Sequence, residues 1–476
     1  MTSAAFLDAL RNIVGDAGLL HDEADAAAYV TGARYGAGRA RCVVRPATSR
    51  EVSRVVALCV RQRVALVPQG ANTGLVGAST PDGSGAQVIL SLNRLRGRCD
   101  VDVVNRTVTV DAGVLLHELN DALEPHGLCF PVDLGANPSI GGMVAANTGG
   151  TRLIRYGDVR HNLLAVEAVM LEPAGELVRF GKPLRKDNTG FDLKQLFVGT
   201  SGVAGVITQV TLEVHPRPKQ SATALVVPVS DEAVMQLLRE LESELGDFLS
   251  AFEGMSADAM CAAIDHVPSL RNPFNGGMPD FAILIELESC SSAVATGLDL
   301  QQVLNEFLEA RLGKLIIDAV VGRGRELWHL RHSISEGTRS LGKPIAFDVS
   351  LPRADIMRFR REARALLTAR YPHLRVADFG HIADGGMHFN LAWPHDAARG
   401  YDVDVVKRVR DELYALVVHG FAGTYSAEHG IGPHNLAWYR MFTVPLALQL
   451  SGRLQRLLDP HRLCGVVELG STPEAM

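Results

Sequence analysis

The stretch Pro68-Gln-Gly-Ala-Asn-Thr-Gly-Leu-Val-Gly77 decides the fold prediction for the first half of this 476-residue chain. It follows the β-rich run Val64-Ala-Leu-Val67 and has too many glycines and turn formers to continue a strand. Glycine allows φ > 0 and close approach, so backbone N–H groups in such a loop can cradle a phosphate, with Asn72 and Thr73 as additional polar donors. The spacing matches neither the Gly-x-Gly-x-x-Gly fingerprint nor a Walker loop.

Two more glycine-dense regions follow, at Pro131–Gly150 and at Arg185–Thr208. A single glycine-rich loop is usually an ordinary connection between strands. Three of them within about 140 residues favour an extended phosphorylated cofactor such as flavin adenine dinucleotide (FAD), whose doubly negative pyrophosphate needs many backbone donors.

Composition excludes several classes of protein. The formal net charge of −6 and the scattered basic residues argue against a nucleic-acid partner. No run of 18 apolar residues predicts a transmembrane segment, and Met1–Leu20 has neither a basic start nor an apolar block typical of a targeting signal. Seven cysteines without a Cys-x-x-Cys pair indicate a reducing compartment, for which we predict the cytoplasm.

The pattern of elements changes at His215-Pro-Arg-Pro218. Before it, short β-rich runs alternate with helical ones, and Thr48-Ser-Arg-Glu51 reads as a capping box that opens a helix to about Arg61. Prolines at this spacing break regular pairing, so we expect a domain boundary there. Beyond it, predicted strands and helices alternate as an α+β layer with an antiparallel sheet, at 223–229, 232–245, 281–288, 293–312 and 314–319.

The segment His381-Ile-Ala-Asp-Gly-Gly-Met-His-Phe-Asn390 predicts a β-hairpin, because Asp384-Gly385 is a strong two-residue turn signal. With that turn, His381 would face His388 directly, with Cβ atoms about 4.5–5.5 Å apart. Two imidazoles at that distance can share one metal ion. Asn390 would point to the same face. The alternative is a plain cross-strand histidine pair.

A second polar segment, Ser426-Ala-Glu-His-Gly-Ile-Gly432, offers a carboxylate next to a histidine. Glu428 can supply a third, anionic ligand and leave an open position for a substrate, which is typical of a catalytic zinc site. His429 would remain free to act as a base. Taken alone, a Glu-His pair in a glycine-flanked loop is a weaker signal than the histidine pair.

With these residues assembled, the chain resembles the vanillyl-alcohol-oxidase-type flavoprotein family. Within that family it is similar to the D-2-hydroxyglutarate and D-lactate dehydrogenase branch. The resemblance covers about residues 40–470 and rests on five collinear segments, namely 68–74, 141–150, 185–190, 380–390 and 426–432.

The resemblance implies an α+β protein with a two-part α/β FAD-binding domain (1–217) and a cap domain (218–425) that has an antiparallel sheet and flanking helices. A C-terminal segment (426–476) would return to the FAD domain. Members that bind flavin covalently use a His or Cys near the pyrophosphate loop, where this chain has Asn72 and Thr73, so noncovalent FAD is expected. The implied FAD contacts are Pro68, Gly70, Ala71, Asn72, Thr73, Gly74, Gly77, Ser79, Pro131, Gly135, Ile140, Gly141, Asn147, Gly150, Gly202 and Ile207.

The resemblance also implies roles in catalysis. His381, His388 and Glu428 would bind zinc, although the same ligands suit manganese or iron(II). His429 would be the base and a substrate contact, and Asn390 would contact the substrate through its amide.

Two more residues, Arg331 and Ser335, would bind a substrate carboxylate. Hydroxyglutarate-specific members carry a Lys where this chain has Ala346, and Lys343 is the nearest candidate to replace it. The usual C-terminal Asn-Pro-Gly-Lys reads Leu463-Cys-Gly-Val466 here.

The function expected is a FAD- and metal-dependent dehydrogenase that oxidises a D-2-hydroxy acid to the 2-oxo acid by hydride transfer to flavin N5. D-2-hydroxyglutarate is the first candidate and D-lactate or another small D-2-hydroxy acid the second. A flavin-fold subunit of a larger complex and an ether-lipid synthase are the rivals. No second nucleotide motif appears, so the electron acceptor would be a quinone, a cytochrome or an electron-transfer flavoprotein rather than NAD. A homodimer is left open.

Overall fold

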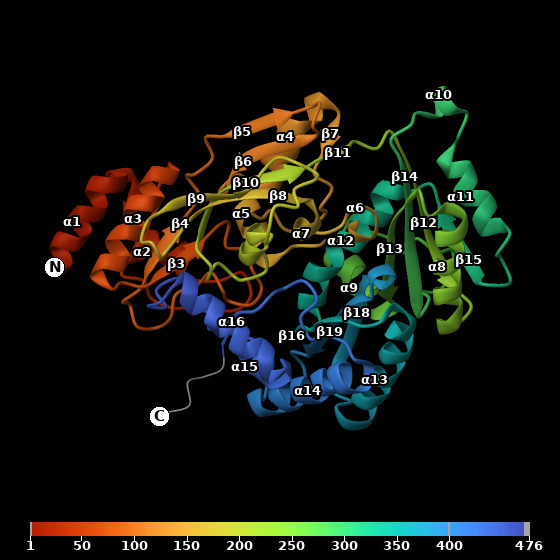
Figure 1. The fold of residues 1–476 in the computed structure, drawn as a ribbon. Coiled ribbons are helices and arrows are strands. Elements are labelled where there is room, and N and C mark those ends of the chain that lie inside the picture. The colour runs from red at the N-terminus through yellow and green to blue at the C-terminus, as the bar shows by residue number, and fades with distance from the viewer. Residues whose placement is uncertain (1, 398–399, 471–476) are drawn as a thin grey trace.

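Two sheets build the N-terminal half of the protein (Figure 1). In the computed structural model, which describes residues 2–397 and 400–470, the first sheet has the order β1-β2-β4-β3. Its last three strands run parallel, as expected for an α/β unit. The strands are β1 (Leu19–Leu20), β2 (Cys42–Val44), β3 (Leu66–Gln69) and β4 (Val88–Ser91).

Helix α3 (Ser49–Gln62) connects β2 to β3 and begins at the predicted cap. The Thr48 hydroxyl accepts the backbone N–H of Glu51 at 3.2 Å. The Glu51 carboxylate reaches back to the N–H of Ala47 at 2.8 Å, one residue before the expected partner. The buried face of α3 belongs to one hydrophobic core that also includes residues of both N-terminal sheets.

The second sheet, of order β5-β6-β10-β8-β9, is antiparallel throughout. Its strands are β5 (Cys99–Asp102), β6 (Thr107–Asp111), β8 (Leu163–Val169), β9 (Leu177–Gly181) and β10 (Val206–Glu213). The short helix α5 (Ile140–Ala146) packs against β10, and α4 (Leu116–Leu123) lies beside β5.

A large antiparallel sheet dominates the second half, as predicted, and we call it the cap sheet. Its order is β15-β12-β14-β13-β18-β19-β16, and β17 also pairs with β19. The strands are β12 (Gln220–Pro228), β13 (Leu249–Ser256), β14 (Phe281–Ser289), β15 (Ile316–Val321), β16 (Lys343–Ile345), β17 (Asp348–Ser350), β18 (Arg375–His381) and β19 (Gly386–Trp393).

Helices cover both faces of the cap sheet. Helices α9 (Ala257–His266) and α12 (Gly324–Ser340) share one core with one face of the sheet. The other face packs against α8 (Asp231–Leu245), α11 (Leu300–Glu309), α13 (Ile356–Arg370) and α14 (Val403–Ala415). The single helix predicted at 293–312 is broken, because Gly297 adopts φ 69° and ends α10 (Ala293–Thr296).

The connection between the halves differs from the prediction in one detail. His215–Pro216 forms the two-residue strand β11, which pairs with β7 (Leu128–Cys129). The expectation that the prolines exclude pairing is therefore wrong at Pro216, since a proline is tolerated at the edge of a two-stranded ladder.

The C-terminal segment contacts both halves. Helix α15 (Leu436–Phe442) contributes Trp438 to the core of the cap, and α16 (Pro445–Leu458) follows it. The chain then pairs with β3, where the N–H of Leu66 donates to Leu463 and the N–H of Gly465 donates to Leu66. Residues 471–476 of the predicted segment lie outside the described residues. No helix in the described part of the chain is both long and apolar enough to cross a membrane.

Gly337 allows α12 to approach α9. A Cβ at this position would lie 2.5 Å from the carbonyl oxygen of Ala262 and 2.7 Å from the Cα of Ala263, so the two helices would have to separate. We expect Gly337→Ala to lower the urea midpoint, because overpacking costs about 1–3 kcal/mol and the gain in helix propensity, at most about 1 kcal/mol, offsets only part of it. Gly276→Ala is the control, since a Cβ there meets nothing within 4 Å. An unchanged midpoint in Gly337→Ala would show that the helix contact tolerates the methyl group.

Candidate active site

One cavity of about 480 Å³, which we call the main cavity, is lined by residues from both halves of the protein. Glycine-rich loops of the N-terminal half form part of its wall. The cap contributes His381, His388 and Asn390, and the C-terminal segment contributes Glu428 and His429. The structure therefore brings together two motif groups that lie more than 170 residues apart in the sequence.

Most of the residues expected to contact FAD line this cavity. They are Pro68, Gly70, Ala71, Asn72, Thr73, Gly74, Ser79, Gly135, Gly141, Gly150, Gly202 and Ile207. The other four, Gly77, Pro131, Ile140 and Asn147, are not part of its wall. Ile140 is buried in the core, and Asn147 ends α5 with φ 56° and donates its amide to Asp158.

The backbone of these loops leaves room for a bound group. A Cβ added at Gly135 would meet nothing within 4 Å, and one added at Gly74 would meet only the Ser79 hydroxyl at 4.0 Å. At Gly70 the reason for glycine is different, because a Cβ there would lie 2.0 Å from the Ser139 hydroxyl. Glycines at such places leave backbone open to the cavity, which fits an extended cofactor such as FAD.

Two details of the loop prediction need correction. The amide of Asn72 is not a free donor, because it binds the carbonyl of Thr31 at 2.8 Å while its oxygen accepts the Ser79 hydroxyl. The stretch 185–192 is not part of the cavity wall, and Phe191 is 95% exposed. Arg185 instead pairs with Glu213 on the surface. Only the later part of the third glycine-dense region, at 201–207, reaches the cavity.

The predicted hairpin forms, but its register is shifted by two residues. His388 lies opposite Phe379 rather than His381, and a 3₁₀ turn at Ile382–Asp384 replaces the two-residue turn. Gly385 ends that turn at φ 86°. A shift of two residues keeps every side chain on the same face of the sheet. The rings of His381 and His388 are therefore still neighbours, with centroids 5.2 Å apart.

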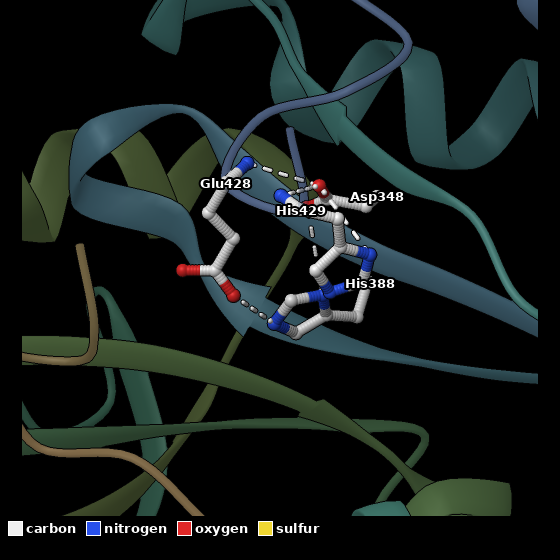
Figure 2. Close-up of side chains that lie close together, drawn as sticks. All are labelled: Asp348, His388, Glu428 and His429. Carbon is white, nitrogen blue, oxygen red and sulfur yellow. Dashed lines mark hydrogen bonds and ion pairs between the residues drawn. The ribbon is translucent and has the colours of Figure 1, made fainter. Parts of the chain in front are cut away.

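Both histidines direct Nε2 towards the same carboxylate oxygen. Glu428 Oε1 lies 3.3 Å from His388 Nε2 and 3.9 Å from His381 Nε2; Figure 2 shows the contact with His388. Ligand atoms about 2.1 Å from a tetrahedral zinc ion lie about 3.4 Å from one another. The two distances to Glu428 Oε1 are therefore close to the spacing of ligand atoms on one metal ion.

Glu253 of β13 holds His381 from the other side. Its Oε1 lies 2.8 Å from His381 Nδ1, and its Oε2 accepts Nε and Nη2 of Arg331 at 2.9 and 2.6 Å. Burial alone would raise the pKa of Glu253, but the charges of His381 and Arg331 outweigh it and lower the pKa to about 2. Burial likewise opposes the charge on His381, but Glu253 and Glu428 raise the pKa of this imidazole well above its ordinary value.

No role was predicted for Glu253, although the sequence contains a signal for one. It is a lone acid in the run Leu249-Ser-Ala-Phe-Glu-Gly-Met-Ser256, all of which is buried. A buried acid in an otherwise apolar strand needs a cationic partner.

Asp348 organises the loop that carries Glu428 and His429 (Figure 2). Its Oδ2 accepts the backbone N–H groups of Glu428 at 2.9 Å and of His429 at 2.8 Å. His429 Nδ1 lies 3.6 Å from the same oxygen. Burial lowers the pKa of His429 below its ordinary value despite Asp348, so the imidazole is neutral at neutral pH.

Asp348, His388, Glu428 and His429 also form a cluster whose potential ligand atoms all lie within 4.8 Å of one another. It shares His388 and Glu428 with the predicted ligand set. The sequence analysis assigned no role to Asp348.

The expected substrate residues fall into two groups. Arg331, Ser335 and Asn390 line the main cavity, and the Asn390 oxygen accepts the N–H of Phe347 at 3.3 Å. Lys343 is not part of the wall, because its ammonium group lies 3.6 Å from the ring centroid of Tyr401. The structure therefore does not bring Lys343 into the position expected for it.

Comparisons with known proteins match both halves of the chain. Residues 40–181 match the FAD binding domain family, and residues 217–465 match the C-terminal domain of FAD linked oxidases. The D-2-hydroxyglutarate dehydrogenase of Rattus norvegicus is 34% identical over 431 residues, which cover 89% of this chain and 77% of that protein. The enzyme of the same name from Arabidopsis thaliana is 32% identical over 433 residues, with 89% and 74% covered.

The structure of p-cresol methylhydroxylase has the same fold, with a TM-score of 0.74 over 96% of this chain and 95% of that one at 14% identity. The prediction of a cytoplasmic location is wrong by comparison with the rat and Arabidopsis relatives, whose names place them in mitochondria. All seven cysteines are unpaired, which indicates a reducing environment but does not distinguish one reducing compartment from another. Both matched domains, the fold and the relatives show that the chain belongs to the vanillyl-alcohol-oxidase-type family of FAD-linked oxidoreductases, in the branch of D-2-hydroxyglutarate and D-lactate dehydrogenases.

Proposed function

We propose that the protein is a FAD- and metal-dependent dehydrogenase that oxidises a D-2-hydroxy acid to the 2-oxo acid. One observation supports this most strongly: a single cavity has the glycine-rich loops in one part of its wall and His381, His388, Glu428 and His429 in another. D-2-hydroxyglutarate is the first candidate substrate, because relatives 34% and 32% identical carry its name. D-lactate is the second, because Ala346 stands where a Lys is expected.

FAD would be held noncovalently by the loops around Gly70, Gly141 and Gly202. The loop at 68–79 contains neither His nor Cys, and Asn72 and Thr73 offer no nucleophile of the kind that forms a flavin link. When bound, FAD would accept the hydride from C2 of the substrate at N5, which is chemistry that no side chain supplies.

The metal would be held by His381, His388 and Glu428 rather than by the cluster that contains Asp348 and His429. Asp348 Oδ2 already accepts two backbone N–H groups, and His429 is needed as a base. The Glu253 carboxylate on His381 Nδ1 leaves Nε2 as the ligand atom, which is the usual arrangement for a metal-bound histidine. Zinc is proposed first, and it would polarise the substrate hydroxyl and lower its pKa.

The remaining roles belong to side chains of the cavity wall. His429 is neutral at neutral pH and can accept the hydroxyl proton as the hydride leaves. Asp348 fixes the backbone of His429 and so positions this base. Asn390, Ser335 and the free donors of Arg331 would bind carboxylate oxygens.

The electron acceptor stays a prediction, with a quinone, a cytochrome or an electron-transfer flavoprotein as the candidates. The same holds for a homodimer. The rival function, a flavin-fold subunit without its own catalysis, leaves the buried and ion-paired His381–Glu253–Arg331 chain without a purpose.

Anaerobic mixing tests the proposed function directly. We expect D-2-hydroxyglutarate or D-lactate to bleach the flavin absorbance of the purified protein, while the L-isomers leave it unchanged. A protein that binds flavin but is not bleached by any D-2-hydroxy acid would contradict the proposal.

Removal of the metal should show that the metal and FAD bind at two separate sites. We expect His388→Ala, or treatment with a chelator, to leave the protein yellow and to slow flavin reduction by at least about 100-fold, because the metal contributes several kcal/mol to the transition state. His329→Ala is the control, since this exposed histidine of α12 is outside the cavity wall. Loss of the flavin together with the metal would contradict the division into two sites.

The pH dependence of the rate of flavin reduction should follow the protonation of His429. A base works when unprotonated, and burial lowers the pKa of His429, so the rate of flavin reduction should fall only below about pH 6.5, the ordinary value for histidine. His429→Asn should lower this rate by about 10²- to 10⁴-fold and abolish the acid limb. An acid limb that persists in the variant would assign it to another group.

Glu253→Gln tests the support of His381. We expect the affinity for zinc, measured by competition with a chelator, to fall by about 10- to 100-fold because the carboxylate orients the ligand imidazole. Asp378→Asn is the matched control: Asp378 is also a buried acid on the same region of the cap sheet, but it pairs with Arg360 and Arg364 instead. Equal zinc affinities in the two variants would show that Glu253 does not support zinc binding through His381.

A further inference from the structure

A second cavity of about 10 Å³, enough for about one water molecule, adjoins the main cavity. We call this cavity, together with the wall that it shares with the main cavity, the distal subsite. The two cavities share Arg34, Ser335, Arg339 and Asn390, so the distal subsite is a continuation of the wall that holds the expected substrate residues. Ala346 also lines it. The resemblance places at Ala346 the Lys of hydroxyglutarate-specific members, and Arg34 and Arg339 line the same small cavity as this alanine.

Arg34 is a partly buried cation without an anionic partner. Within the described residues, no carboxylate lies within ion-pair distance of its guanidinium and no group accepts a hydrogen bond from it. Burial lowers its pKa, and Arg339 and Arg410 act in the same direction, whereas Tyr35 and Asp348 oppose the shift without forming an ion pair with it. A buried charge without a partner is unfavourable, so an anionic ligand there would gain affinity.

Arg339 is held only weakly by its own helix. Its sole ion pair in the described chain is with Glu336, one turn away, at 4.0 Å, and both side chains are more than half exposed. Such a pair contributes little and can be exchanged for a ligand. Its guanidinium is therefore available at the wall of both cavities.

A third arginine adds positive charge behind the subsite. Arg410 is buried, and its guanidinium donates to the carbonyl of Ala346 at 2.8 Å and to the hydroxyl of Tyr35 at 3.1 Å. Neither acceptor is charged. The surroundings of Ala346 thus hold three guanidinium groups. Within the described residues their one ion pair is between Arg339 and Glu336, and Asp348 acts on Arg34 from beyond ion-pair distance.

The arrangement along α12 places these groups in order. Arg331, Ser335 and Arg339 are spaced by four residues, so they follow one face of the helix. Arg331 lies at the end nearest the proposed metal, but Glu253 occupies its Nε and Nη2. Arg339 lies two turns further along, beyond Ser335. A second carboxylate of a substrate bound at the metal would need a cation at that far end.

We propose that Arg339 and Arg34 bind the distal carboxylate of a dicarboxylic D-2-hydroxy acid and replace the ammonium group that is missing at Ala346. This inference rests on the proposed function and narrows its substrate class to dicarboxylates. Lys343 takes no part, because its ammonium group lies on Tyr401.

Calorimetric titration of the FAD- and zinc-loaded protein with 2-oxoglutarate and with pyruvate tests this without turnover. The two 2-oxo acids differ in the distal carboxylate. We expect wild-type protein to bind 2-oxoglutarate more tightly. Arg339→Ala and Arg34→Ala should each lower the affinity for 2-oxoglutarate by about 10- to 100-fold, which is the range for a hydrogen bond between charged groups. The affinity for pyruvate should fall by less than about threefold.

Two further variants serve as references. Arg339→Lys should recover part of the affinity for 2-oxoglutarate because it keeps the charge but loses the planar donors. Arg325→Ala, at an exposed arginine of the same helix that lines neither cavity, should bind as wild type.

Equal affinities of wild-type protein for the two acids, or equal losses for both acids in Arg339→Ala, would overturn the proposal. Flavin bleaching by D-2-hydroxy acids is measured separately on the wild-type protein. If the wild-type flavin is bleached but Arg339→Ala keeps its selectivity for 2-oxoglutarate over pyruvate, only the distal subsite is contradicted. If the flavin is not bleached, the proposed function is contradicted.

Discussion

The ion-paired carboxylate of Glu253 is the constraint on which the site depends. It is 1% exposed and bridges Arg331 of α12 and His381 of β18. Removing one partner of such a buried pair costs about 3–5 kcal/mol, since the remaining charge stays desolvated. The bridge therefore fixes a cap helix to the cap sheet and determines which ring nitrogen of His381 faces Glu428.

The same bridge determines which arginines of the cavity wall remain available to a ligand. Because Glu253 engages Arg331, that guanidinium cannot offer all of its donors to a ligand. Arg34 and Arg339, which lack strong partners, lie further along the wall. Glu253 orients His381 of the hairpin, and Asp348 has the same effect on the C-terminal loop. It accepts two backbone hydrogen bonds and so orients Glu428 and His429. Three segments distant in sequence thus converge on one cavity.

Local signals in the sequence predicted much of this. The capping residues at Thr48 and Glu51, the antiparallel cap sheet and the glycine-rich loops were readable because each depends on neighbouring residues. The hairpin register was not, because Asp384-Gly385 also suits a longer turn with a glycine at positive φ. The prediction that His381 and His388 share one face of the sheet is still correct, because a shift of two residues keeps each side chain on its face. Glu253 and Asp348 were missed because their partners lie far away in the chain. Arg34 was missed because only the folded protein places it at the cavity wall.

The central claim is that one metal ion, bound by two imidazoles and a carboxylate, lies beside the flavin. Anomalous diffraction at the zinc edge, from crystals of the protein loaded with FAD and zinc, tests it most directly. The account predicts one peak about 2.0–2.2 Å from His381 Nε2, His388 Nε2 and a Glu428 oxygen, facing the central ring of the flavin. A peak bound by a different set of side chains, or no peak in the main cavity, would contradict it.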